Sequence, residues 1–330
     1  MLYTIKNEAL KVVIDNHGAE LHSIQTLDGT EYLWQGDPAV WNGQAPNLFP
    51  YVARLTDQKY TFEGKEYSMK IHGFINAVDL YVETEERDQI TFRYDSGEET
   101  LTQYPFPFIY RITYLLDGHT LKITNKVENI GEKRMYFGLG GHPGFNVPLE
   151  AGLSFEDYCL EFSEKANPSR VLFTDDCYRT GENVDYPLED GVRIPLHHDL
   201  FDRDAIVLKN VDHRVTIRSD KGKRAVSLFF PDFPAIGFWH MPKMEAPYVC
   251  LEPWRSLPSR KGIVEDFAQQ EDLVALDGGK IVFLLIEGIT GYAVPEKIQG
   301  SLTVAAFALL FGLMIFATYN DILRLITGAI

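Results

Sequence analysis

The fold class is decided by residues 110–127, YRITYLLDGHTLKITNKV. Residues 110–116 and 121–127 are rich in β-branched and aromatic side chains, which favour extended strands. The turn sequence DGH at residues 117–119 separates the two runs and is short enough to close an antiparallel hairpin. The stretch therefore predicts two neighbouring strands of an antiparallel sheet.

Strand-like runs of the same kind occur on both sides of this hairpin. They cover residues 10–15, 81–85, 90–94, 214–218 and 225–230. Residues 220–223 (DKGK) predict a second hairpin turn between the last two runs. The sequence before residue 255 predicts no amphipathic helix of normal length. Parallel strands are usually joined by such helices, so a parallel sheet is not expected. We therefore expect an all-β protein, a large antiparallel sandwich, in which residues 1–275 form one domain.

The composition argues against several classes of protein. The chain has 330 residues, of which 45% are hydrophobic and 24% charged, a balance typical of a folded domain. Its 31 Lys and Arg against 47 Asp and Glu give a net charge of −16, which argues against a nucleic-acid partner. The three cysteines lack CxxC spacing, so we expect neither a disulfide framework nor a zinc ribbon. The charged N-terminal segment is unlike a signal peptide, and a cytoplasmic location is expected.

The C-terminal part of the chain has a different composition. Residues 301–319, SLTVAAFALLFGLMIFATY, carry no charge over 19 residues, which is the length of a short membrane-spanning helix. A helix that is apolar on every face needs protein or lipid on all sides, and a β-rich domain rarely provides the protein. We therefore expect residues 276–330 to form a hydrophobic tail that associates with a membrane through residues 301–319. The alternative is a buried C-terminal helix of the main domain.

Two of the nine histidines stand out because glycines accompany them. His72 lies in the segment IHGF, and His142 lies in the segment GGHPGF. Glycines at such places let a ligand or another backbone approach closely. Taken singly, each histidine is also compatible with a partly buried imidazole that is bonded to a carbonyl. Both are candidates for ligand binding or proton transfer.

Three charged residues are candidates for the same site. Arg54 lies among apolar residues in FPYVARL, where a guanidinium needs either a polar ligand or a buried ion pair. Glu252 ends the apolar run YVCLE, where burial would raise its pKa and suit it to proton transfer, unless it is a surface strand residue. Asp204 is the weakest candidate, because Asp202 competes with it. The tryptophans offer flat faces that stack on sugar rings, although a core accounts for most of them.

Six segments carry a resemblance to a known family. In chain order, FPYVARL, IHGF, LGGHPGF, FDRDAIVL, FWH and CLEPWRSLPSR closely resemble motifs of the aldose 1-epimerase (galactose mutarotase) superfamily, in particular its LacX-like branch. The resemblance covers residues 1 to about 275. It implies a β-supersandwich and interconversion of the α and β anomers of a sugar without a cofactor or metal. The segment GHPGFN departs from the Asn-His-Xaa-Tyr-Phe-Asn type of the better-known galactose mutarotases, which leaves the identity of the sugar open.

The resemblance also implies a role for each candidate residue. His142 resembles the family's general acid and Glu252 its general base. Arg54, His72 and Asp204 resemble its contacts to the sugar hydroxyls. We therefore expect an aldose 1-epimerase-like enzyme that acts on an aldohexose. The alternatives are a non-catalytic carbohydrate-binding or regulatory module tethered to a membrane, and a sugar-phosphate mutarotase, which needs a second cation near Arg54.

The tail resembles a different family. The segments ALDGGKIVFLLIE, PEKIQG and TYNDILR are similar to the end of a bacterial site-2 intramembrane metalloprotease, in which the Asp of the Leu-Asp-Gly motif, here Asp277, is a zinc ligand. No HExxH occurs in the sequence, so the other ligands are missing and no metal site is expected. The join falls within residues 272–279. Residues 280–286 (KIVFLLI) must therefore either replace the last strand of the sandwich or leave a sheet edge open.

Overall fold

The computed structural model describes residues 1–270 and 272–292 of the chain. One compact unit extends over Met1–Gly291. Besides strands, the described residues form the α-helix α1 (Glu98–Gln103) and the 3-10 turns η1 (Thr56–Gln58), η2 (Ile75–Ala77), η3 (Phe155–Asp157) and η4 (His198–Phe201). The expected hydrophobic helix at residues 301–319 lies outside the described part. Within that part, no helix combines the length and the apolar character that crossing a bilayer requires.

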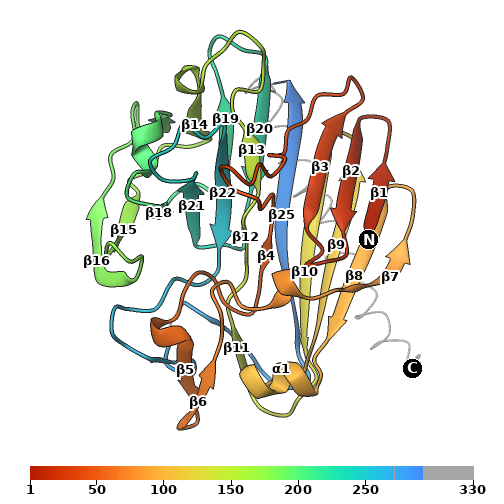
Figure 1. Ribbon diagram of the computed structural model, residues 1–330, viewed down its shortest axis with the longest axis vertical. Coiled ribbons are helices and arrows are strands. Elements are labelled where there is room, and N and C mark those ends of the chain that lie inside the picture. Colours follow the sequence, from red (N-terminus) through yellow and green to blue (C-terminus); the bar gives the residue numbers. More distant parts are fainter. Residues whose placement is uncertain (271, 293–330) are drawn as a thin grey trace, which may run out of the picture. The chain divides into compact units, whose positions relative to one another are not determined.

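Two large sheets make up most of this unit (Figure 1). The nine-stranded sheet has the order β17 (Arg193–Pro195), β14 (Cys159–Phe162), β19 (Arg214–Arg218), β20 (Arg224–Phe229), β25 (Ile281–Tyr292), β10 (Thr120–Asn129), β9 (Phe108–Asp117), β8 (Gln89–Asp95) and β7 (Tyr81–Glu85). The second sheet has the order β16 (Arg179–Asp185), β15 (Ser169–Phe173), β18 (Ile206–Lys209), β21 (Ala235–Trp239), β22 (Tyr248–Trp254), β12 (Gly140–Gly141) and β4 (Asn47–Leu48), and β13 (Gly144–Asn146) also pairs with β22.

Three smaller sheets complete the described part of the chain. They are β1 (Leu2–Lys6), β2 (Leu10–Asp15) and β3 (Leu21–Thr26); β23 (Glu265–Asp266), β5 (Lys59–Phe62) and β6 (Lys65–Ser68); and β11 (Met135–Phe137) with β24 (Val274–Leu276). β23 pairs with β5 in parallel, whereas β9 and β10 of the first large sheet and β21 and β22 of the second pair antiparallel. The expectation of a nearly all-β antiparallel architecture is confirmed.

The hairpin expected at residues 110–127 is present. β9 and β10 pair antiparallel, with Thr120 opposite Asp117 at the turn and Asn129 opposite Phe108 at the far end. Along β9, buried and half-buried side chains alternate, so one face of the strand packs into the core. The second expected hairpin is β19 with β20.

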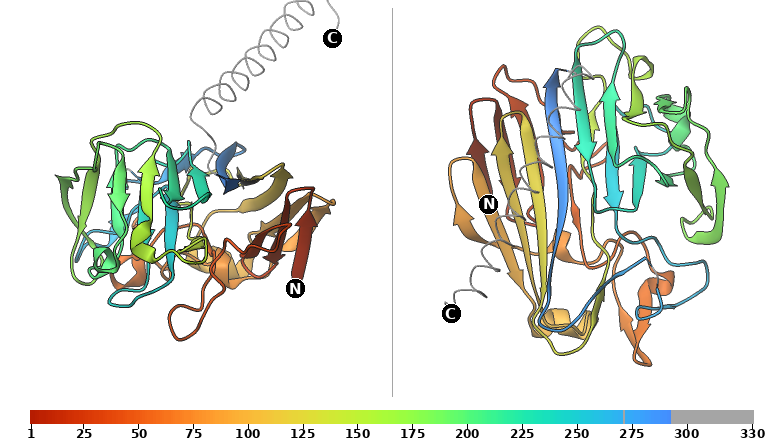
Figure 2. Two further views of the ribbon diagram at one scale, coloured as in Figure 1. Left: turned by 90° about the horizontal axis from the view of Figure 1, so that it is seen from above. Right: turned by 180° about the vertical axis from the view of Figure 1, so that it is seen from behind.

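The apolar segment KIVFLLI becomes part of an interior strand. β25 pairs with β10 and lies between β10 and β20 in the nine-stranded sheet, as Figure 2 shows from behind. Leu284 and Ile286 are 4% and 5% exposed, whereas Phe283, which precedes Leu284 in the pleat, is 60% exposed. Of the two outcomes that the sequence left open, replacement of the last strand is the one observed. The compact unit thus includes β25 up to Gly291, a strand that a boundary at residue 275 would place in the tail.

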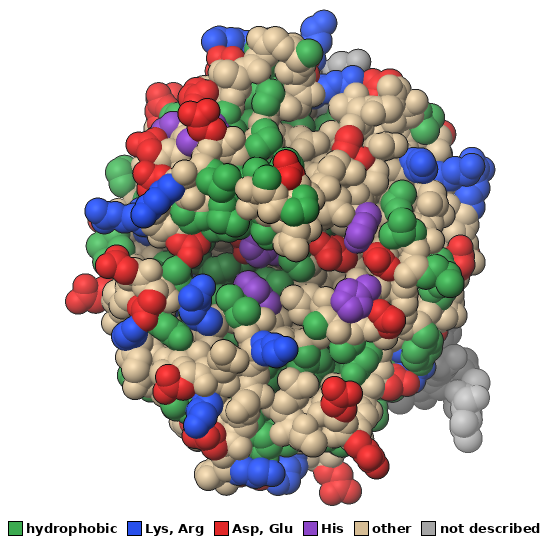
Figure 3. Space-filling view, in the orientation of Figure 1, with side chains coloured by type: hydrophobic (Ala, Val, Ile, Leu, Met, Phe, Trp, Pro, Cys, Tyr) green, Lys and Arg blue, Asp and Glu red, His purple; other side chains and the backbone are tan. Residues whose placement is uncertain are grey.

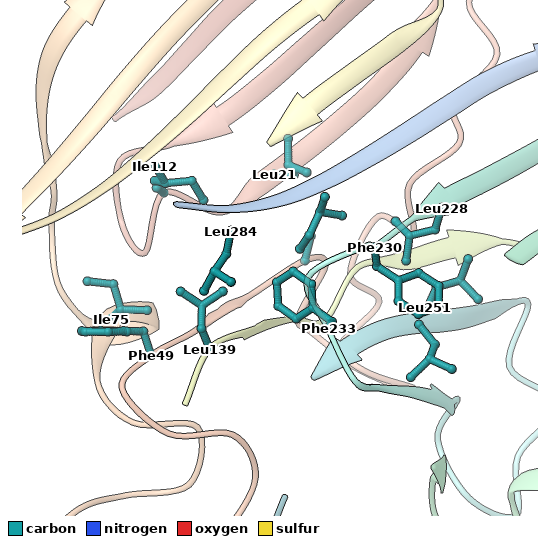
Figure 4. Packing of buried hydrophobic residues seen from close by; sticks show 14 of the residues in the cluster. Leu21, Phe49, Ile75, Ile112, Leu139, Leu228, Phe230, Phe233, Leu251 and Leu284 are labelled. Atoms are coloured by element: carbon teal, nitrogen blue, oxygen red, sulfur yellow. The ribbon is translucent and has the colours of Figure 1, made fainter. Parts of the chain in front are cut away.

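One buried hydrophobic cluster contains side chains from both large sheets. Figure 4 shows Ile112 of β9 and Leu284 of β25 on one side of Phe233, and Leu251 of β22 on the other. Burial of each such side chain contributes roughly 1.5–3 kcal/mol. This packing fixes the position of β22, which carries Glu252.

Candidate active site

A cavity of about 430 Å³ is lined in part by strands β21 and β22. All five residues singled out in the sequence line it: Arg54, His72, His142, Asp204 and Glu252. Figure 3 shows a hollow on this face in which histidine and hydrophobic side chains gather, with charged side chains around it. The volume is typical of pockets for small molecules, which span about 300–1,000 Å³.

The five side chains come from separate segments. Arg54 lies between β4 and η1, His72 between β6 and η2, His142 between β12 and β13, Asp204 between η4 and β18, and Glu252 within β22. His72 and Asp204 have left-handed backbone conformations, with φ of 65° and 71°. Such conformations cost energy in residues other than glycine and cluster at functional sites.

His142 and Glu252 form a close pair. Nε2 of His142 is 3.3 Å from Oε1 of Glu252, whose residue is 1% exposed. The backbone N–H of His142 donates to the carbonyl of Pro46 at 3.1 Å, and Nε1–H of Trp254 donates to Oε2 of Glu252 at 3.2 Å. Nδ1 of His142 is buried and has no hydrogen-bond partner within the described ranges. The two groups are close to the distance at which a proton passes between a general acid or base and its partner.

Burial shifts the protonation of both members of the pair. Burial lowers the pKa of His142 to about 4, opposed by the charge of Asp204. Burial also raises the pKa of Glu252 well above its usual value, opposed by the hydrogen bond from Trp254 and assisted by the charge of Asp204. Both shifts favour the uncharged forms. Burial thus favours the arrangement in which His142 is neutral and Glu252 carries the proton.

His72 is fixed as a hydrogen-bond donor. The N–H of Ala53 donates to Nδ1 of His72 at 3.1 Å, and the N–H of His72 donates to the carbonyl of Ala53 at 2.9 Å. Burial, followed by the charges of His142 and Arg54, lowers the pKa of His72 to about 3. Because Nδ1 of the neutral ring accepts a hydrogen bond, Nε2 carries the proton. The cavity wall thus contains a neutral N–H donor.

Arg54 and Asp204 place opposite charges on the wall. Nη1 of Arg54 donates to the carbonyl of Asp176 at 3.2 Å, and within residues 1–270 and 272–292 no carboxylate forms an ion pair with it. Asp204 accepts the N–H of Ala205 on Oδ1 at 2.9 Å and the thiol of Cys177 on Oδ2 at 2.7 Å. Both charged groups keep capacity for a polar ligand.

Three of the four tryptophans line the cavity: Trp41, Trp239 and Trp254. The ring centroids of Trp41 and Trp239 are 5.1 and 5.4 Å from that of His142. Trp34 packs instead in a buried cluster beneath them. The cavity therefore combines flat apolar faces with polar groups, as a sugar site requires.

The sequence did not identify Cys177 or the turn at residues 174–178 as part of the cavity wall. Cys177 lines the cavity next to Asp204, although its sequence context indicated only an unpaired cysteine. Asp202, the competitor of Asp204, is exposed and does not line the cavity. The turn composition of residues 174–178 locates the loop, but no local pattern shows that this turn contacts a residue 27 positions later.

The described residues contain one group of side chains that could hold a metal. His142, Cys250 and Glu252 carry ligand-type atoms within 4.8 Å of one another. A tetrahedral zinc site holds its ligands at about 2.0–2.3 Å from the metal, so these atoms would have to move closer together. Asp277 is outside this group; it is exposed and accepts a hydrogen bond from Nε of Arg134 at 2.6 Å. That the chain works without a cofactor or metal stays a prediction.

The fold and the cavity describe an antiparallel β-sandwich with a small-molecule site that contains an acid–base pair. The sequence model of the family described as "Aldose 1-epimerase" matches residues 1–266. "Protein LacX, plasmid" of Lactococcus lactis subsp. lactis is 34% identical over 291 residues, which covers 85% of this chain and 97% of that protein. The X-ray structure of a galactose mutarotase related enzyme from Lactobacillus acidophilus has 34% identity and a TM-score of 0.84, and the match covers 90% of this chain and 99% of that one. The chain therefore belongs to the aldose 1-epimerase family.

A second similarity is confined to a short part of the chain. "Zinc metalloprotease RasP" of Shouchella clausii is 47% identical over 51 residues, which are 16% of this chain and 12% of that protein. The likeness to site-2 proteases expected from the tail is thus present as a partial match. It is too short to transfer an activity to this chain.

Proposed function

We propose that this chain interconverts the α and β anomers of an unphosphorylated aldohexose through the open-chain aldehyde. The 3.3 Å approach of His142 to Glu252 inside the cavity carries this proposal, because anomer exchange needs one proton donor and one proton acceptor. Membership of the aldose 1-epimerase family supports a sugar as the ligand. Arg54 and His72 donate hydrogen bonds to its hydroxyls, and Asp204 accepts one.

Ring opening consists of two proton transfers and one bond cleavage. The carboxylate of Glu252 removes the proton of the C1 hydroxyl, and protonated His142 gives a proton to the ring oxygen. As the bond from C1 to the ring oxygen breaks, C1 becomes an aldehyde carbonyl and the ring oxygen becomes a hydroxyl. Rotation about C1–C2 followed by the reverse transfers closes the ring on either face.

The protonation that burial favours corresponds to the open-chain stage of this reaction. After ring opening, Glu252 holds the proton of the C1 hydroxyl and His142 has lost its own. Burial lowers the pKa of His142 to about 4 and raises the pKa of Glu252, so this neutral pair is favoured over the ionic one. One shared proton serves both directions.

The charges of the wall favour a sugar without phosphate. A phosphate ester would need a second cation beside Arg54. Lys261 reaches the turn that Arg54 contacts, but its ammonium is already paired with the carboxylate of Asp176. Because Asp176 neutralises the Lys261 ammonium, Lys261 does not supply the second cation that a phosphate group beside Arg54 would need.

Polarimetry on freshly dissolved α-anomers of several aldohexoses, with their 6-phosphates in parallel, tests the proposal. We expect the first-order rate constant of mutarotation to rise above the spontaneous value in proportion to protein concentration for at least one unphosphorylated sugar. Saturable binding without acceleration would support the non-catalytic carbohydrate-binding module. Acceleration confined to the phosphates would support a sugar-phosphate mutarotase.

A further inference from the structure

The cation and the anion of the cavity wall are contacted by one turn, residues 174–178, which joins β15 to β16. The carbonyl of Asp176 accepts the hydrogen bond from Nη1 of Arg54 at 3.2 Å. The thiol of the next residue, Cys177, donates to Oδ2 of Asp204 at 2.7 Å. Two successive residues therefore touch the two charged groups that the proposed function assigns to sugar binding.

Hydrogen bonds within the turn hold its shape. The N–H of Thr174 donates to the carbonyl of Tyr178 at 2.9 Å, and the N–H of Cys177 donates to the carbonyl of Thr174 at 2.8 Å. Oγ1 of Thr174 also donates to Oδ1 of Asp176 at 2.6 Å. Outside the turn, Lys261 pairs with Asp176, and its ammonium lies 5.2 Å from the centroid of the Tyr178 ring. Hydrogen bonds within the turn and the contacts of Lys261 therefore stabilise the conformation of residues 174–178.

The hydrogen bond between Cys177 and Asp204 joins two residues with unusual backbone conformations. Their φ angles are 64° and 71°, in the left-handed region that residues other than glycine rarely adopt. Each such residue costs of order 1–3 kcal/mol and persists only where its surroundings hold it in place. Their contact at the cavity wall points to a requirement for this particular placement of the carboxylate.

We propose that Cys177 is a positioning residue for sugar binding, whose thiol sets the orientation of the Asp204 carboxylate. The N–H of Ala205 fixes Oδ1 of this carboxylate at 2.9 Å, and the thiol fixes Oδ2 at 2.7 Å. Hydrogen bonds to both oxygens restrict rotation of the carboxylate, and each oxygen keeps a lone pair for a sugar hydroxyl. This inference rests on the proposed function, since it takes Asp204 as a contact to the sugar.

The thiol of Cys177 is protonated at neutral pH and can donate a hydrogen bond. Burial, followed by the hydrogen bond to Asp204 and its charge, raises the pKa of Cys177 to about 12, while the charge of Arg54 opposes the shift. A thiolate would repel the carboxylate, whereas the protonated thiol donates to it. Cys177 therefore acts through Asp204 and not as a nucleophile.

Substitution of Cys177 tests the positioning role with the full chain. Cys177→Ala removes the donor, and we expect KM for the preferred sugar to rise by about 5- to 10-fold while kcat changes by less than about 2-fold. Cys177→Ser keeps a donor and should restore KM to within about 2-fold of wild type. Cys159→Ala is the matched control, because Cys159 is half-buried in β14 and does not line the cavity. Should Cys177→Ala fail to fold, Cys177→Gly, which suits a φ of 64°, must show the same rise.

A double variant separates positioning from a general structural effect. In an Asp204→Ala background there is no carboxylate to orient, so adding Cys177→Ala should leave KM unchanged. An unchanged KM in the single variant, or a further rise in the Asp204→Ala background, would overturn the positioning role. A wild-type chain without mutarotation would overturn the proposed function instead. In that case the dissociation constant for the sugar, measured by NMR, must still rise in Cys177→Ala.

Discussion

His142 lies opposite Glu252 because the short strands on either side of it, β12 and β13, both pair with β22 in the same register. Gly140 of β12 pairs with Trp254, and Gly144 of β13 pairs with Cys250. Continuing this antiparallel register places residue 142 across from residue 252, and the distance between Nε2 and Oε1 is 3.3 Å. The acid–base pair is therefore set by backbone pairing across the sheet.

This placement predicts that each member of the pair is essential to turnover and dispensable for binding. His142→Asn and Glu252→Gln should each lower kcat for mutarotation by at least about 100-fold, because general acid or base catalysis contributes about 10²–10⁴-fold. Gln at position 252 still offers an oxygen to Nε1–H of Trp254, so the local structure should persist. Polarimetry gives the rate, and calorimetry with the same sugar gives the affinity.

Two surface substitutions test whether replacing any histidine or glutamate lowers kcat nonspecifically. His119→Asn, in an exposed turn, and Glu66→Gln, on an exposed position of β6, should leave kcat unchanged. Near wild-type turnover in either His142→Asn or Glu252→Gln would remove that residue from the mechanism.

The protonation of the pair predicts the pH dependence of kcat/KM. Since burial lowers the pKa of His142 to about 4, activity should fall as the pH drops through about 4, where a second proton binds and the pair has no base. At high pH, loss of the proton from Glu252, whose pKa burial raises, leaves no acid. The profile should be flat between these limits.

Initial rates between about pH 3 and 9, with tryptophan fluorescence as the check on folding at each pH, measure this profile. A fall centred near the ordinary histidine value of about 6.5 would show that the pKa of His142 is not depressed.

The sequence could predict the elements and the candidate residues, but not the long-range contacts among them. The strands at residues 110–127 follow from local composition and turn chemistry, and His142 from its glycine-rich surroundings. The position of β25 between β10 and β20 depends on pairing with strands from much earlier in the chain, so the sequence left both replacement and an open edge as outcomes. The contact of Cys177 with Asp204 likewise has no local signal, because it arises from the packing of two separate loops.

Arg54 should contribute to affinity more than to turnover. Arg54→Met removes the guanidinium and keeps an unbranched apolar side chain, so the sugar should bind more weakly by about 1.5–3 kcal/mol, the range for a hydrogen bond to a charged group. Calorimetry measures the change, and Arg134→Met is the control, because Arg134 pairs with Asp277 and does not line the cavity. An unchanged dissociation constant would give Arg54 a structural role.

The interior position of β25 predicts that two adjacent substitutions change the free energy of unfolding by very different amounts. Leu284 is 4% exposed and packs in the cluster that joins the two sheets, so Leu284→Ala should lower the free energy of unfolding by about 2–5 kcal/mol. Phe283 is 60% exposed, so Phe283→Ala should change it by no more than about 0.5 kcal/mol. Urea unfolding followed by tryptophan fluorescence measures both values on the same chain.

Truncation tests the same strand as a whole. A chain that ends at Lys280 lacks β25, which leaves the facing edges of β10 and β20 without a partner and the cluster around Leu284 incomplete, so it should not fold. A chain that ends at Tyr292 keeps β25 and should show the cooperative unfolding of a single domain. Because residues 280–286 belong to the segment that resembles a protease tail, the result decides whether that segment is required by the sandwich. A chain ending at Lys280 with a native near-ultraviolet circular dichroism spectrum would show that it is not.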